Sequence, residues 1–227
     1  MTSGDTPEAT EEENGEDVEA TPSEDETLPE DDLAASLLLT EDDFPAGWTE
    51  LPFVDEEENP ETAEAFADCG FGEQRAPGLV GRAETGDFVE DGGDGPPTIE
   101  HRVGVFEDEE AVAAALAVLP EQLDCFVAVL EGGAIDTPEA SVVAASFEQI
   151  DFIELGDRTD AYRIELEFEL TTEETEVDSA VAYFDVVFTS VGRIASQIQV
   201  FDVLFPFGED ELQALAEAAA DKLAQAE

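Results

Sequence analysis

Four strand-like segments follow one another between residues 141 and 201, and this succession constrains the fold more than any other feature of the chain. The second segment, DAYRIELEFEL at 160–170, alternates apolar residues with Arg163 and three glutamates. Because successive side chains of a strand point to opposite faces, one face of this strand meets a core and the other meets water. Short connections such as SVGR at 190–193 suit hairpins. The four segments therefore predict a mainly antiparallel sheet.

Helical patterns flank these strands. Residues 108–133 carry apolar side chains at spacings of three and four, which indicates an amphipathic helix that kinks or restarts at Pro120. A second helix closes the chain over 209–225, with acids in its first turn and Lys222 near its end. Shorter helices are expected at 33–39 and 60–68.

Two further strands are expected before the long helix. The segment TIEHRVGVF at 98–106 alternates clearly, and a weaker strand is expected between Leu79 and Val89. Runs of strands joined by short loops and flanked by helices indicate the α+β class. We expect a mainly antiparallel sheet of about five or six strands, with its helices packed on one face.

The acidic residues of the chain are concentrated at its beginning but are not confined there. The chain has 61 acids and 7 bases, and residues 1–32 contain 14 of the acids and none of the bases. With almost no large apolar side chains, that segment cannot bury enough surface to offset its ordering entropy. We expect 1–32 to be a disordered acidic tether and 33–227 to be a single folded domain. A solubilising tail without an anchor is the alternative.

The folded part is itself strongly negative, because the other 47 acids face only 7 bases. At about 0.1 M salt the Debye length is about 10 Å, so such a surface repels itself across most of a small domain. At about 1 M it falls to about 3 Å. We therefore expect a salt-adapted protein, the alternative being an acidic secreted protein from a GC-rich genome. Nucleic acid and anionic membrane surfaces are poor partners for a protein of this charge, and we expect neither to be bound directly.

Cys69 and Cys125 are the two cysteines, 56 residues apart in segments expected to be helical. No CxxC motif or Cys/His cluster indicates a metal site instead. We expect a disulfide, which would place the chain outside the cytoplasm, and two buried free thiols are the alternative. No run approaches 18 apolar residues and no signal peptide precedes the domain. The chain is then either cytosolic or a mature form without its export segment.

Few residues stand out as candidates for a binding site. His101, the only histidine, falls on the apolar face of TIEHRVGVF, which favours a core role over a ligand or a base. Trp48 follows a Pro-Ala-Gly turn, where it could pack on the leucine-rich helix or stack on a ligand. Arg102 and Arg163 fall opposite the apolar sets of their strands. They could pair with acids or line a groove that holds an anion.

Carboxylates at Glu90, Asp91 and Asp94 surround glycines in the segment EDGGDG and could hold a calcium ion. A solvated loop is the alternative, because the spacing of a calcium-binding EF-hand is missing. No HExxH, GxSxG or glycine-rich phosphate motif is present, so we expect no enzyme activity and no cofactor.

The order of these features resembles that of known proteins. A leucine-rich segment before DDFPAGW, an EHRVGVF strand, an alanine-rich helix with a cysteine, a run of strands and a closing helix are similar to actinobacterial cell-envelope lipoproteins. The same order resembles the extracellular sensor domain of an actinobacterial Ser/Thr kinase and lipoproteins of the Mog1/PsbP-like group. The resemblance implies an antiparallel sheet flanked by helices, an exterior location, and ligand binding or signalling. The kinase sensor domain has two disulfides, whereas this chain has one cysteine pair.

We therefore expect an extracytoplasmic, membrane-tethered binding or sensor domain. It would recognise a small molecule or an envelope protein in a groove between sheet and helices. It would act as a monomer and touch the membrane only through an anchor outside this sequence. The alternatives are a structural envelope lipoprotein without a small ligand and a secreted hydrolase that uses carboxylates.

Overall fold

The computed structural model of the protein describes residues 29–52, 60–70, 76–90, 97–171 and 177–226. Its strands are β1 (Trp48–Glu50), β2 (Leu79–Glu84), β3 (Phe88–Glu90), β4 (Thr98–Phe106), β5 (Ala140–Gln149), β6 (Arg158–Thr171), β7 (Val177–Val191) and β8 (Ile194–Val203). Its helices are α1 (Pro29–Ser36), the 3-10 turn η1 (Glu41–Asp43), α2 (Pro60–Asp68), α3 (Glu109–Ala117), α4 (Leu119–Glu131) and α5 (Glu209–Gln225).

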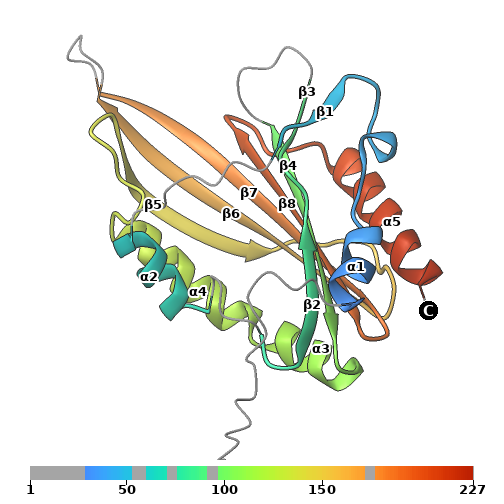
Figure 1. The fold of residues 1–227 in the computed structure, drawn as a ribbon. Helices are drawn as coiled ribbons and strands as arrows, with labels where there is room; N and C mark the ends of the chain where they lie inside the picture. Colours follow the sequence, from blue (N-terminus) through green and yellow to red (C-terminus); the bar gives the residue numbers. More distant parts are fainter. Residues whose placement is uncertain (1–28, 53–59, 71–75, 91–96, 172–176, 227) are drawn as a thin grey trace, which may run out of the picture.

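These strands form one open sheet (Figure 1). Its order is β1-β3-β4-β8-β7-β6-β5, with β2 paired to β4, and every pairing is antiparallel. The predicted α+β class and the antiparallel sheet are confirmed. The sheet has eight strands rather than five or six, because β1 was not predicted and the segment near Leu79 to Val89 forms two strands, β2 and β3.

Helices cover both faces of the central strands, so the expectation of helices on one face is wrong. Figure 1 shows α2, α3 and α4 together along one side of the sheet and α1 and α5 at the other. Strand β7 carries the uninterrupted apolar run Val186, Val187 and Phe188. Val187 packs in the α5 core, whereas Val186 and Phe188 pack in the core under α3 and α4. An apolar run without alternation is typical of a strand buried on both sides.

The helix α5 forms the core on its side of the sheet through five fully or nearly fully buried residues, Leu212, Leu215, Ala216, Ala219 and Leu223. Helix α1 packs beside it, with Ala34 buried against Val103 and Val105 of β4. Gly81 of β2 permits this approach, because a side chain there would collide with the backbone of Glu30. Helix α1 begins at Pro29, inside the segment 1–32 that was expected to be the tether, and residues 1–28 lie outside the described part.

The predicted long helix is two helices, because α3 ends at Ala117 and α4 begins at Leu119 with Pro120 in its first turn. Asp108 caps α3, its carboxylate accepting a hydrogen bond from the Ala111 N–H at 2.9 Å. By length and composition alone, Glu109–Glu131 could cross a membrane. In this structure the segment is interrupted at Val118 and its buried leucines pack on the sheet.

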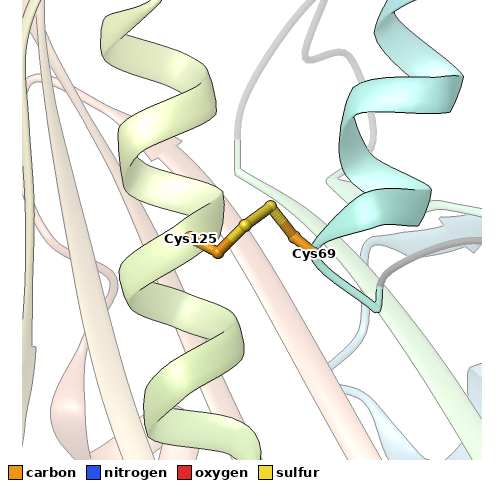
Figure 2. The surroundings of a disulfide bond; sticks show 2 residues. All are labelled: Cys69 and Cys125. Carbon is orange, nitrogen blue, oxygen red and sulfur yellow. A yellow bond between two sulfur atoms is a disulfide. The ribbon is translucent and has the colours of Figure 1, made fainter.

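A disulfide joins Cys69, at the end of α2, to Cys125 in the middle of α4 (Figure 2). The two Cα atoms are 5.4 Å apart, within the usual range for a disulfide. The predicted pairing is confirmed. The bond fixes α2 to α4, which in turn packs on β5 and the core under the sheet.

We predict that reducing this disulfide lowers the free energy of unfolding by about 4 kcal/mol, because a loop of 56 residues is released in the unfolded chain. Urea unfolding in molar salt, with and without reductant, measures the change. The Cys69→Ser/Cys125→Ser double variant should match the reduced protein and ignore reductant. Two thiols that alkylate in the untreated folded protein would contradict the prediction.

Candidate functional site

A groove of about 780 Å³ lies between β2, the α3–α4 pair and the sheet face beneath them. Its volume falls within the range of small-molecule sites, roughly 300 to 1,000 Å³. The helices supply one wall and β2 the other, while β4, β7 and β8 form the floor. The apolar part of its lining includes Leu79, Phe106, Ala114, Leu116, Leu119 and Phe188. The groove thus offers an apolar surface reachable from solvent.

Small residues keep the floor of the groove low. Gly104 of β4 and Ala195 of β8 are direct cross-strand partners, and both line the groove. A Cβ at Gly104 would lie 2.9 Å from Leu79 Cδ1 and 3.2 Å from Phe106 Cε2. The space above Gly104 is therefore already bordered by apolar side chains, and a larger residue would fill it.

Polar residues line the groove at β2 and the adjoining strands. Arg102 is paired in register with Glu84 of β2 and with Gln197 of β8. Its guanidinium forms ion pairs with Glu84 at 3.3 Å and with Glu100 at 2.7 Å. Burial raises the pKa of Glu100, and the charge of Arg102 opposes that rise.

Arg82 also lines the groove, and its side chain is exposed. Its backbone N–H donates a hydrogen bond to Asp31 Oδ1 at 2.9 Å. Within the part of the chain that the structure describes, its guanidinium has no ion pair or hydrogen bond. Arg82 is not among the binding residues predicted from the sequence. The rarity of arginine and lysine in this chain was the one feature that could have singled out Arg82. The strand pattern around Arg82 is weak, so the sequence did not indicate which residues lie next to it.

The lining of the groove is poor in acids. Outside residues 1–32 the chain has 47 acids in 195 residues. At that frequency, a set of residues as large as the groove lining, which has 21 described members, would contain about five acids. The 21 described lining residues contain one acid, Glu84, and two bases, Arg82 and Arg102. Along α3 and the start of α4, residues 111–120 carry no charge although several are exposed. The high density of acidic residues, called here the acidic coat, is therefore interrupted at the groove.

His101 lies on the opposite face of the sheet and is fully buried. The Leu39 N–H donates a hydrogen bond to His101 Nδ1 at 2.9 Å. The proton of the neutral ring is then on Nε2, which donates to Ser196 Oγ at 2.8 Å. Burial, assisted by the charge of Lys222, lowers the pKa of His101 to about 3. The imidazole thus holds the segment after α1 against β4 and does not line the groove.

Trp48 and Arg163 are also away from the groove. Trp48 packs against Phe44 and Phe207, with ring centroids 5.5 and 6.4 Å apart, rather than on α1. Arg163 donates two hydrogen bonds, of 2.6 and 2.9 Å, to the buried carboxylate of Asp185. It borders a separate cavity of about 400 Å³ beside the start of α5.

Arg102 and Arg163 were considered together in the sequence analysis because each falls opposite an apolar set. The structure places them on different faces of the sheet. Arg102 shares its face with Phe106 and the helices α3 and α4, whereas Arg163 faces Phe207 and Leu212. Of the four predicted ligand-binding residues, Arg102 alone lines the groove.

The proposed calcium ligands cannot be assembled from the structure. Asp91 and Asp94 lie outside the described residues, and Glu90 is exposed at the end of β3, opposite Trp48 of β1. Elsewhere, within the described ranges, no three histidine, cysteine or acidic side chains are arranged to hold a metal ion. The calcium site remains an untested prediction.

No protein-family model matches this chain, and no curated protein matches its sequence. Among solved structures, the extracellular domain of PknH from Mycobacterium tuberculosis is similar, with 10% sequence identity and a TM-score of 0.47. The match covers 86% of this chain and 96% of that domain. The extracellular domain of PknH is thus a coarse structural neighbour of this chain.

We predict that His101 makes the stability of the fold depend on pH. An unfolded chain protonates histidine near pH 6.5, whereas the folded protein does so only near pH 3. As the pH falls from about 7.5 to about 5, the unfolded state takes up a proton that the folded state excludes, and stability falls by about 2 kcal/mol. Urea unfolding in molar salt at the two pH values measures this loss.

The His101→Gln variant provides the control, because it lacks the titrating ring while the carboxylates titrate equally in both proteins. Its stability should fall by about 2 kcal/mol less than that of the wild type over the same range. The same loss in both proteins would show that His101 is not the group responsible.

Proposed function

We propose that this protein is an extracytoplasmic binding or sensor domain whose groove takes up a small, largely apolar molecule. The observation that carries the proposal is the interruption of the acidic coat at an apolar groove of about 780 Å³. A chain that is acidic almost everywhere else keeps this lining nearly free of carboxylates.

The physical reason is desolvation. A ligand that covers a carboxylate without pairing it removes water from a charge, which is costly. A ligand that covers Leu79, Leu116 and Leu119 instead gains about 25 cal/mol for each Å² of apolar surface removed from water. A largely apolar lining with one acid among its described residues therefore favours occupation by an apolar molecule.

The surrounding structure supports a groove of fixed shape. The α3–α4 pair that forms its wall is fixed to α2 by the Cys69–Cys125 bond. Gly70, directly after Cys69, and Gln122, one turn before Cys125, both line the groove. The disulfide thus stabilises the edge of the site, and a site whose walls are held in place loses less entropy on binding.

We place the domain outside the cytoplasm because structural disulfides persist in oxidising compartments. The segment 1–32 would tether it to a membrane anchor, and the 47 acids of the remainder would be hydrated and screened in concentrated salt. The proposal does not include catalysis. The only imidazole lies on the other face of the sheet, with both nitrogens engaged and a pKa of about 3.

We predict that Ala114→Trp abolishes binding in the groove. Ala114 is an exposed residue of α3 that lines the groove, so an indole there would occupy ligand space without disturbing the core. The affinity for N-phenyl-1-naphthylamine, an uncharged fluorescent probe of apolar sites, should fall at least about tenfold in molar salt. Fluorescence titration measures the affinity.

Ala113→Trp is the matched control, because Ala113 is the preceding exposed residue of the same helix and does not line the groove. Both changes replace alanine by tryptophan in a helix and carry the same propensity cost, about 0.5 kcal/mol. The control should bind the probe as the wild type does. No probe binding to the wild type, or equal losses in the two variants, would contradict the proposed function.

A further inference from the structure

We propose that the ligand of the groove is an amphiphile with an anionic head, which lies between Arg82 and Arg102 while its apolar body lies along α3 and α4. This inference rests on the proposed function and adds the charge of the ligand to it. The relevant chemistry is a carboxylate or another singly charged anionic group at one end of a chain.

The position of the two arginines suits one anionic group. Arg82 of β2 is paired in register with Gly104, and Arg102 lies two residues before Gly104 on β4. Such diagonal neighbours on one sheet face are about 7 to 8 Å apart at their backbones, within the reach of long side chains. Both side chains line the groove and are exposed, so both guanidiniums can reach the same ligand, Arg82 without an ion pair and Arg102 while paired with Glu84 and Glu100.

Arg82 differs from the other described bases in its lack of a partner. Arg102, Arg158 and Arg163 form ion pairs with acids, Lys222 pairs with Asp43, and Arg193 donates to the Phe106 carbonyl oxygen. Within the described ranges, the guanidinium of Arg82 has neither kind of contact. In a chain with 61 acids and 7 bases, an arginine beside an apolar groove whose guanidinium pairs with no described acid is available for an external anion.

Neutral amides complete the polar part of the lining. Gln197 is the cross-strand partner of Arg102, and Gln122 reaches the groove from α4. Amide groups can donate hydrogen bonds to an anionic head, whereas carboxylates in their place would repel it. Glu84, the one acid of the described lining, is already paired with Arg102.

The overall negative charge of the chain does not oppose this assignment in concentrated salt. With a Debye length of about 3 Å at about 1 M, the distant acids are screened, while contacts between a guanidinium and an anion at the groove persist. The local charge of the site therefore decides which head group binds. The described lining holds two arginines and one glutamate, and Glu100 pairs with Arg102 from outside the lining, so Arg82 carries the positive charge that no described acid pairs.

The test uses three ligands with the same ten-carbon chain, namely decanoate, decanol and decylammonium, titrated by calorimetry in molar salt. We expect decanoate to bind about tenfold more tightly than decanol, as for a hydrogen bond to a charged group, and decylammonium to bind most weakly. Arg82→Gln should remove the preference for decanoate and leave the affinity for decanol unchanged. Arg82→Lys should keep part of the preference, because it keeps the charge.

Ala214→Glu is the control for net charge. It changes the charge by the same amount as Arg82→Gln, but at an exposed position of α5, on the other face of the sheet. It should leave all three affinities unchanged. Equal affinities for decanoate and decanol, unaffected by Arg82→Gln, would overturn the assignment of the head group and leave the apolar groove in place. Failure of both decanoate and decanol to displace the naphthylamine probe would instead overturn the proposed function.

Discussion

Burial of the central strands on both faces is the constraint on which the rest of the structure depends. Each residue of β4, β7 or β8 belongs either to the core under α1 and α5 or to the side covered by α3 and α4. Two neighbouring residues of one strand therefore have opposite roles. His101 is neutral, hydrogen-bonded and buried, whereas Arg102 is charged and faces the groove. Because successive side chains of a strand point to opposite faces, a buried structural residue and a residue of the groove can be direct neighbours in the sequence.

The same division explains how an extremely acidic chain retains an apolar site. In the core beneath α5, the buried charge of Asp185 is neutralised by Arg163. On the other side, β2 and the α3–α4 pair do not meet over Gly104 and Ala195, and a groove remains. Among its described lining residues, Glu84 is the one carboxylate, although acids are frequent over the rest of the described surface. Exposed apolar surface tends to cause aggregation unless it has a binding partner. An apolar surface in such an acidic chain is therefore consistent with the proposed contact with an apolar ligand.

Local patterns in the sequence were sufficient for part of this architecture. The alternation in DAYRIELEFEL indicated β6, Pro120 indicated the interruption between α3 and α4, and the two cysteines indicated their bond. The second helical layer was missed because Val186, Val187 and Phe188 were assigned to a one-sided sheet. Arg82 was missed because its role depends on register with β4 and on its guanidinium having no ion pair among the described residues. Both are properties of tertiary structure, which no single segment encodes.

The most direct test of the central claim is to locate a bound ligand by amide chemical shifts during a titration with decanoate in molar salt. The account predicts that the largest changes fall on Gly104, Ala114, Leu119 and Ala195, which surround the groove. Residues of α5 and the second cavity, such as Phe207 and Leu212, should change little. Changes centred on that second cavity, or an absence of changes at the groove, would contradict the account.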